Sequence, residues 1–315
     1  MKKKAFILGI TGQDGSYLSN YLLKKNFVVY GFTRSLKDNN FQNLIKLRII
    51  KKINIFKFDQ TNFKYMEKKI LRLKPSHIYI LSGLSSVGIS LQKPIEAYES
   101  NIIPVLNILE ICRKNKLLIK IYNSSSTDCF GNSKVICNEN TPFNPISPYA
   151  RAKASAHWYV KYFRDFFNIR SSNGIVSNHE SILRPDTFAI KKIINYVLNF
   201  DYKKKLIMGN TNIFRDWGFA PDFVKAMYKI NSSRKRDDYI IATGLSTSLD
   251  SIIKKIFSTC KINKKFYVNN FNNYKRKNEI NKVICDISKI KKNLNWSPDH
   301  KINDFIPKLL KKKLF

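Results

Sequence analysis

A glycine-rich turn near the amino terminus constrains the fold of this chain more than any other feature. The sequence GITGQDG places Gly9, Gly12 and Gly15 between an apolar run at 4–9 and an amphipathic run at 16–26. The first run has the length of a buried strand, and the second has apolar residues at helical spacing. Such a turn lets the backbone approach a pyrophosphate closely, at the N-terminus of a helix. The pattern therefore predicts a dinucleotide site, with a purely structural turn as the alternative.

Short β-like runs alternate with helical patterns through the first half of the chain. Further strands are expected at 27–33, 53–59, 77–82 and 117–125, with a long helix over much of 95–115. This alternation is typical of βαβ units and predicts an α/β fold with a doubly wound parallel (Rossmann-type) sheet. Ligands of such sheets bind at the carboxyl ends of the strands.

The residue after the second strand bears on which dinucleotide is bound. A NAD site usually offers a carboxylate there for the ribose hydroxyls, whereas this chain has Arg34, in GFTRS. A guanidinium suits a 2′-phosphate, so the sequence favours NADP over NAD, unless Arg34 is an ordinary surface residue. Asp59, which closes the third strand, is placed to accept a hydrogen bond from the adenine; the alternative is that it caps the next helix.

The second half of the chain is less regular. A helix is expected at 149–167 and a strand at 171–177, followed further on by a strand at 239–244 and a helix at 248–260. The segment between the strand at 171–177 and about residue 225 has no clear pattern. No low-complexity linker separates two domains. We expect residues 1–170 to form mainly an NADP-binding Rossmann domain. Residues 171–315 then form mainly a smaller C-terminal substrate-binding lobe, with some segments returning to the sheet.

The chain is strongly basic, which raises nucleic acid as a partner. Its 57 Lys and Arg against 22 Asp and Glu give a formal net charge of +35. The lysines are nevertheless spread along the chain among Asn and Ile, and no recognition helix, zinc finger or aromatic RNA-binding pattern accompanies them. We expect no nucleic-acid partner, and a surplus that suits an anionic ligand such as a nucleotide diphosphate.

Cysteine usage and hydropathy bear on the compartment. The five cysteines are odd in number and form no CxxC pair, which fits a reducing compartment, and the four histidines lack metal-binding spacing, so no metal is expected. No apolar run reaches the roughly 18–20 residues of a membrane span. The apolar stretch after MKKK breaks at glycines without a signal-peptide cleavage site. These features predict a cytoplasmic protein with no membrane partner.

A tyrosine and a lysine four residues apart form the clearest catalytic pattern. In SPYARAKASAHWY, Tyr149 and Lys153 fall on one face of the expected helix. A nearby ammonium stabilises a phenolate, so that the tyrosine can act as a base well below its free pKa of about 10, and the lysine can hold a nicotinamide ribose. YxxxK occurs by chance in many helices, but the preceding Ser147-Pro148 cap supports a functional pair.

The strand end YNSSSTDCFGN lies about 23 residues before the tyrosine. Its Ser126 and Asp128 can present a hydroxyl and a carboxylate at the ligand edge of the sheet. The alternative is a polar turn that closes the strand, with Asp128 as its cap.

These motifs together resemble the extended short-chain dehydrogenase/reductase family, which combines a GxxGxxG turn, a Ser or Thr and a YxxxK. Within it, the chain is similar to the GDP-mannose 4,6-dehydratase family. The similarity spans nearly the whole chain, and NHES and RDWG are its most specific parts. The segments that carry it are GITGQDGSYL (9–18), TPFNPISPYARAK (141–153), NGIVSNHES (173–181), TFAIKKI (187–193), RDWGFAPDFVKAM (215–227) and DISKIKKNLNWSP (286–298).

The resemblance implies an NADP-dependent lyase of nucleotide-sugar metabolism, which dehydrates a GDP-mannose-type sugar to its 4-keto-6-deoxy form. Tyr149 takes the C4 hydroxyl proton while a hydride passes from C4 to NADP⁺. A carboxylate then removes the C5 proton as water leaves from C6, and the hydride returns to C6. Ser126 falls at the family's active-site Thr position and can hydrogen-bond the C4 oxygen, and Asp128 falls at its catalytic Glu position.

The motifs and the resemblance together identify two sets of contact residues. The cofactor set is Gly9, Ile10, Thr11, Gly12, Gln13, Asp14, Gly15, Arg34, Asp59, Gln60, Leu81, Ser85, Tyr149, Lys153, His179 and Arg184. The substrate set, for a GDP-sugar, is Ser126, Asn178, Glu180, Lys192, Arg215 and Arg276.

Several positions depart from the family pattern. The family reads Thr-Ser-Glu-Leu-Tyr-Gly where this chain reads Ser-Thr-Asp-Cys-Phe-Gly at 126–131. The shorter Asp128 sets its carboxylate back by about 1.5 Å, and a displacement near 1 Å can cost roughly a hundredfold in rate. Glu96 stands where the family has a cofactor-contacting Tyr, and Leu183 replaces an Arg. The segment after Arg34, which helps build the family's tetramer, is shortened, so a tetramer is not assumed. The resemblance implies a homo-oligomer, as a dimer or a tetramer.

Asp128 also leaves other functions open. One is a C4 dehydrogenase, reductase or epimerase of a related GDP-sugar that eliminates no water. Another is a catalytically silent nucleotide-binding regulator, against which the intact set of Ser126, Tyr149 and Lys153 argues. The sequence pattern does not distinguish mannose from a related heptose, because that choice depends on the shape of the pocket.

Overall fold

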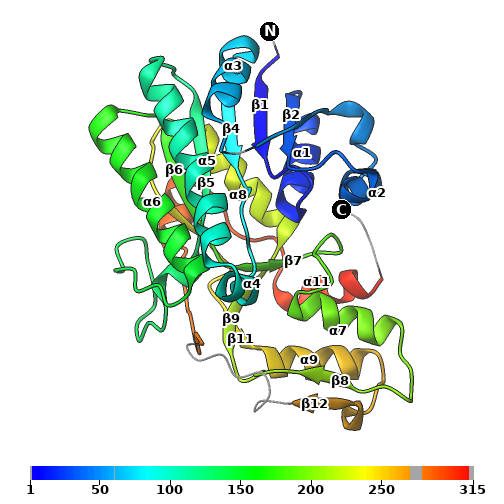
Figure 1. The fold of residues 1–315 in the computed structure, drawn as a ribbon. Coiled ribbons are helices and arrows are strands. Elements are labelled where there is room, and N and C mark those ends of the chain that lie inside the picture. Colours follow the sequence, from blue (N-terminus) through cyan, green and yellow to red (C-terminus); the bar gives the residue numbers. More distant parts are fainter. Residues whose placement is uncertain (1, 60, 270–278, 312–315) are drawn as a thin grey trace.

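The computed structural model describes residues 2–59, 61–269 and 279–311 (Figure 1). Its centre is a seven-stranded parallel sheet in the order β10-β6-β5-β4-β1-β2-β3. The sheet confirms the predicted Rossmann-type fold. Its strands are β1 (Lys4–Leu8), β2 (Val28–Thr33), β3 (Asn54–Lys57), β4 (His77–Ile80), β5 (Lys120–Ser126), β6 (Ser171–Val176) and β10 (Tyr239–Ile241).

Both faces of the sheet are covered by helices, and strand β1 is apolar on both sides. In β1, Ala5 and Ile7 belong to one core cluster, and Phe6 and Leu8 to the other. Helices α1 (Gln13–Lys24) and α8 (Ala220–Ser232) cover the first face. Helices α3 (Phe63–Leu73), α5 (Pro94–Lys114) and α6 (Pro148–Phe167) cover the second (Figure 1).

A third core lies in the smaller lobe below the sheet in Figure 1. It is built from α7 (Ala189–Leu198), β8 (Leu206–Met208), β9 (Phe214–Phe219), α9 (Leu249–Thr259) and α11 (Ile302–Leu310). In addition, β9 pairs with β7 (Asn178–Glu180) and β11 (Ser246–Ser248), and β8 pairs with β12 (Tyr267–Asn269). No helix within the described ranges combines the length and apolarity needed to cross a membrane.

The expectation that the segment before residue 225 is irregular is wrong. It contains β7, α7, β8, β9 and the start of α8. Helix α7 buries Ile190, Ile193, Ile194 and Val197, a spacing of i, i+3, i+4 and i+7 that is the signature of an amphipathic helix. The three-residue strands around it are too short to show any period.

Candidate active site

A dinucleotide-sized cavity of about 600 Å³ lies at the carboxyl ends of β1, β2 and β4. The structure places most of the expected cofactor residues along this dinucleotide cavity. They are Gly9, Thr11, Gly12, Gln13, Asp14, Gly15, Arg34, Leu81, Ser85 and Arg184. The side chain of Ile10 does not line it, because it is buried in the core against Gly31. Gln60 lies outside the described residues.

Glycine is required in the turn between β1 and α1. Gly9 has φ +83°, and a Cβ there would lie 2.9 Å from the backbone of Leu81. A Cβ on Gly15 would lie 2.3 Å from the carbonyl oxygen of Gly9. Helix α1 starts after Gly12, which offers no side-chain cap to the first N–H groups. The helix N-terminus therefore retains free donors and a favourable dipole for a pyrophosphate.

Arg34 lies between the dinucleotide cavity and an adjoining cavity of about 320 Å³ that Asp59 also lines. Its Nη1 is 3.4 Å from Glu96 Oε1, and both side chains are exposed. Asp59 Oδ1 accepts hydrogen bonds from the N–H and hydroxyl of Thr61, which lower the pKa of Asp59. The alternative that Asp59 caps the next helix is wrong, because Asn62 is the residue that caps α3.

A second cavity, of about 530 Å³, adjoins the first and shares Asp14, Leu81, Ser85 and Arg184 with it. This catalytic cavity collects residues from both halves of the chain. The predicted residues that line it are Ser126, Asp128, Tyr149, Lys153, Asn178, His179, Glu180, Lys192 and Arg215. Arg276 lies outside the described residues. Within those residues, no group of three or more His, Cys, Asp or Glu is arranged to hold a metal ion.

Ser126 ends β5 and caps the short turn that follows it, Thr127–Phe130. Its Oγ accepts a hydrogen bond of 3.2 Å from the backbone N–H of Asp128. Asp128 is half-buried and lies in the first turn of that segment. The cap of this turn is thus the serine, and the hydroxyl of Ser126 and the carboxylate of Asp128 line one cavity.

The start of α6 positions Tyr149 and Lys153. Ser147 Oγ accepts from the N–H of Ala150 at 3.1 Å, and Pro148 follows at the first helical position, as expected of a capped helix. Lys153 Nζ donates to the carbonyl oxygen of Ser124 at 2.8 Å. Burial lowers the pKa of Lys153 to about 8.

The pKa of Tyr149 is raised rather than lowered. Burial disfavours the phenolate, and the negative charge of Asp128 adds to this effect, while a hydrogen bond with Ser126 opposes it. The ammonium of Lys153 is engaged by a backbone carbonyl. The phenol is therefore neutral near pH 7 until a ligand or a shift of Lys153 favours its ionised form.

Residues of the NHES segment form hydrogen bonds with Gln13 and Asp14 of the glycine-rich turn. His179 Nε2 lies 2.8 Å from Asp14 Oδ1, Gln13 Nε2 donates to the carbonyl oxygen of His179 at 3.2 Å, and Ser181 Oγ donates to Gln13 Oε1 at 2.7 Å. Burial alone would raise the pKa of Asp14, but His179, together with smaller contributions from Arg184 and Gln13, outweighs it and the pKa is lowered. Gln13 and Asp14 thus bind the segment as well as lining the cavity.

The substrate-side residues have the following contacts. Glu180 is buried, which raises its pKa, and its Oε2 lies 3.7 Å from Arg184 Nε. Lys192 Nζ donates to the carbonyl oxygen of Ile207 at 2.9 Å. Arg215 Nη1 donates to that of Phe214 at 2.9 Å. Two cations therefore line the lobe side of the catalytic cavity.

The cavity also has lining residues that sequence reasoning did not identify. Ser82 and Gly83 follow β4, and Ser177 follows β6, so the rule that ligands bind at strand ends could have found them. Trp217 and Asn210 come from the lobe. Trp217 lies in the RDWG segment, two residues after Arg215 on β9, so that motif could have found it, whereas nothing in the local sequence of Asn210 indicates a cavity.

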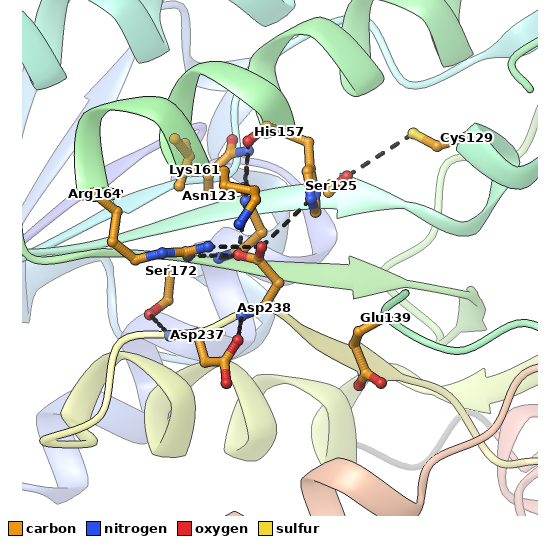
Figure 2. A network of polar contacts seen from close by, with 12 residues as sticks. Asn123, Ser125, Cys129, Glu139, His157, Lys161, Arg164, Ser172, Asp237 and Asp238 are labelled. Atoms are coloured by element: carbon orange, nitrogen blue, oxygen red, sulfur yellow. Dashed lines mark hydrogen bonds and ion pairs between the residues drawn. The ribbon is translucent and has the colours of Figure 1, made fainter. Parts of the chain in front are cut away.

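A buried polar network joins α6 to β5 and β6 (Figure 2). Asp238 accepts two hydrogen bonds from Arg164, of 2.7 and 2.9 Å, and one from Asn173 Nδ2. His157 Nε2 lies 3.5 Å from Asp238, and Asn123, three residues before Ser126 on β5, donates to Asn173. The network thereby connects the helix that bears Tyr149 to the strand that ends at Ser126.

Comparison with known protein families gives one match over most of the chain. A family model described as GDP-mannose 4,6 dehydratase matches residues 6–309. GDP-mannose 4,6 dehydratase 2 of Arabidopsis thaliana is 34% identical over 309 residues, which cover 94% of this chain and 83% of the relative. GDP-mannose 4,6 dehydratase of Homo sapiens is 33% identical over 323 residues, which cover 93% and 87%.

Solved structures show the same fold at lower identity. UDP-glucose 4-epimerase of Thermotoga maritima has a TM-score of 0.87 and 20% identity, over 98% of both chains. dTDP-glucose 4,6-dehydratase of Bacillus anthracis, in complex with NAD, has a TM-score of 0.87 and 19% identity, over 98% and 96%. At these identities the likeness establishes the fold of the chain.

Proposed function

The chain belongs to the GDP-mannose 4,6-dehydratase family, and we propose that it dehydrates a GDP-mannose-type nucleotide sugar to its 4-keto-6-deoxy form. The family match over residues 6–309 supports a lyase. The observation that carries the proposal is a single cavity lined by Ser126, Asp128, Tyr149 and Lys153, directly beside a dinucleotide cavity.

We propose NADP as the resident cofactor. The glycine turn, the uncapped start of α1 and the dinucleotide cavity fit a dinucleotide, and Arg34 offers its 2′-phosphate a cation. The ion pair of Arg34 with Glu96 is exposed and therefore weak, so the guanidinium can exchange partners. When bound, NADP⁺ supplies a hydride acceptor that later returns the hydride, which makes the overall reaction redox-neutral.

The chain's own residues would move the protons. Tyr149 accepts the proton of the sugar C4 hydroxyl, whose oxygen Ser126 hydrogen-bonds. Because burial and Asp128 raise the pKa of the phenol, ionisation requires the positive charge of Lys153, one helical turn away. Asp128 removes the C5 proton as water leaves from C6. Lys153 also binds the nicotinamide ribose.

The lobe side of the catalytic cavity would hold the nucleotide part of the substrate. Lys192 and Arg215 supply positive charge suited to a diphosphate. Asn178 and Glu180 lie on β7, which places them on the same wall, where they can contact the sugar. These assignments rest on the family resemblance and on the shared cavity.

Assembly and compartment are two further parts of the proposal. Helix α6 exposes a run of aromatic side chains that a second subunit would cover, which supports a homo-oligomer. They are Trp158, Tyr159, Tyr162, Phe166 and Phe167. The five cysteines are all free, which supports a reducing compartment such as the cytoplasm. Light scattering on the purified chain measures its oligomeric state directly.

Incubation with NADP⁺ and GDP-mannose in deuterated water, followed by mass spectrometry and NMR, tests the reaction. The dehydratase gives a product lighter by one water, with deuterium at C5 and no accumulation of NADPH. Accumulation of NADPH without loss of water would contradict the proposal and would indicate an enzyme that stops at the C4 ketone.

The cofactor preference is tested separately by dinucleotide binding. Arg34→Gln should weaken NADP⁺ binding by about 10- to 150-fold and leave NAD⁺ binding unchanged, since one charge-assisted contact is worth about 1.5–3 kcal/mol. Equal effects on the two dinucleotides would contradict the role given to Arg34.

A further inference from the structure

A second charged cavity lies at the opposite edge of the sheet, where β5 and β6 begin. This basic pocket has a volume of about 260 Å³. It is formed by the starts of the two strands, the end of α8 and the segment after α8. Its lining is Lys120, Arg170, Ser172, Ile230, Asn231, Ser233, Arg234 and Arg236.

The charge of the pocket exceeds what the overall composition explains. Four of its eight lining residues are Lys or Arg and none is acidic, whereas 57 of 315 residues in the chain are Lys or Arg. The carboxylates that follow Arg236 are engaged elsewhere. Asp237 is paired with Lys289 at 2.8 Å, and Asp238 binds Arg164.

The protein's own acceptors satisfy only part of this charge. Lys120 Nζ donates to the carbonyl oxygen of Ser232, at the C-terminus of α8, at 2.6 Å, where a cation is favourable. Arg236 Nη1 donates to the backbone and side-chain oxygens of Asn168, at 3.3 Å each. Arg170 Nε is buried and has no hydrogen-bond partner among the residues that the structure describes.

The positive charges of the pocket also repel one another. The pKa of Lys120 is lowered by burial and then by the charges of Lys3, Arg170, Arg234 and Arg236. Repulsion of this kind is relieved by a bound anion. Phosphoryl oxygens match the geometry of the arginine guanidinium groups that line the pocket.

We propose that the basic pocket binds a small phosphate-type oxyanion, of the size of phosphate or pyrophosphate. Pockets for drug-sized ligands typically have volumes of about 300–1,000 Å³, so this one suits a small oxyanion better than a whole nucleotide. The site is independent of the proposed dehydratase activity, since it lies at the amino ends of the strands, whereas Ser126 lies at the carboxyl end of β5.

Calorimetric titration with inorganic pyrophosphate tests the site. The full chain is first saturated with NADP⁺ and GDP at 0.15 M salt, which fills the anion sites of the other edge and screens weak surface binding. The wild-type chain should bind one further equivalent. The double variant Arg170→Gln/Arg236→Gln should bind it at least tenfold more weakly.

Two matched variants keep the test decisive. Arg234 is exposed, so Arg234→Glu retains the fold while placing a carboxylate at the pocket, and it should abolish binding. Lys51→Gln/Lys52→Gln removes two exposed positive charges elsewhere and should bind like the wild type. Equal affinity in all variants, or the absence of saturable binding of both pyrophosphate and a second GDP equivalent, would overturn the proposal.

A GDP titration of the same proteins identifies the source of the phosphate groups. A second GDP equivalent that is lost in Arg234→Glu would show that the pocket takes the diphosphate of a nucleotide. If that second equivalent is absent while pyrophosphate binds, the ligand is the free oxyanion. The turnover number of Arg234→Glu should stay within twofold of the wild type, because no lining residue reaches the catalytic cavity.

Discussion

Each end of α6 buries a charged side chain on the same face of the helix, but only the charge near the carboxyl end is paired with an opposite charge. Near the carboxyl end, Arg164 makes two hydrogen bonds to Asp238. Burial would raise the pKa of Asp238, but Arg164 and the other partners lower it to about 2. Near the amino end, Lys153 donates to a neutral carbonyl, and burial lowers its pKa to about 8.

The difference separates structural from functional burial of charge. The pair of Arg164 and Asp238 is matched within the protein, so it fixes the position of the helix against the sheet (Figure 2). The amino end faces a cavity, and the shifted pKa values of Tyr149 and Lys153 there are of the kind found at catalytic sites. One helix thus carries a stable anchor and a reactive end.

Removal of the phenol hydroxyl at the reactive end should give the largest effect. Tyr149→Phe is expected to lower kcat by about 10²–10⁴-fold, the usual contribution of a general base. The melting temperature should change little, because the loss is one hydroxyl at the edge of a cavity. Steady-state kinetics and thermal unfolding measure the two effects. A kcat within tenfold of the wild type would refute the role of Tyr149.

Removal of the charge at the anchored end should act on stability instead. Asp238→Asn leaves the buried guanidinium of Arg164 without a counter-charge and should lower the free energy of unfolding by about 3–5 kcal/mol. The exposed pair of Lys161 and Asp165 on the same helix is a matched control. Lys161→Gln should cost less than about 0.5 kcal/mol; Lys161 is the member to change, because Asp165 Oδ1 also lies 3.4 Å from Arg164 Nε. Urea unfolding distinguishes the two, and equal losses would contradict the comparison.

The same contrast explains how much the sequence predicted. The parallel strands and α6 were predictable, since the apolar runs, the glycine turn and the Ser147-Pro148 cap are local signals. So was the meeting of Tyr149 and Lys153 with the strand end, because helical spacing and the strand-end rule place them together. The contact of His179 with Asp14 was not, because it joins side chains 165 residues apart.

The buried pair of Arg164 and Asp238 was also not predictable from the sequence. Asp238 lies 74 residues from Arg164, and neither residue stands in a motif that marks a buried pair. Helix α7 differs from these side-chain pairs, because its apolar residues recur at helical spacing in the sequence. The prediction nevertheless missed this helix. Long-range side-chain pairs are therefore visible only in the fold, whereas α7 is predictable from its apolar periodicity alone.

Asp128 tests whether the reactive end performs elimination. Asp128→Asn should reduce deuterium incorporation at C5 by about a hundredfold, because the amide cannot accept the proton, while Asp128→Glu should retain incorporation. The negative charge of Asp128 also raises the pKa of Tyr149. Asp128→Asn should therefore lower the pKa of Tyr149. Unchanged C5 exchange would exclude Asp128 as the base.

Acid should weaken the anchored end, with the smallest of the four effects. Burial lowers the pKa of His157 to about 4 from an ordinary 6.5, so the unfolded chain binds this proton more readily than the folded one. The stabilisation is complete above pH 6.5 and falls by about 1.4 kcal/mol per pH unit down to pH 4, or about 2 kcal/mol at pH 5. Asp238 adds a loss only below about pH 4, because its lowered pKa favours folding above that value.

His77 has a similarly lowered pKa and contributes to the same window, so the wild-type curve alone does not isolate His157. The difference between the wild type and His157→Gln does, when urea unfolding is measured at pH 7 and pH 5. The variant should lose about 2 kcal/mol less than the wild type between these values. An identical loss would mean that His157 is protonated without cost, and that the anchor tolerates a second cation beside Arg164.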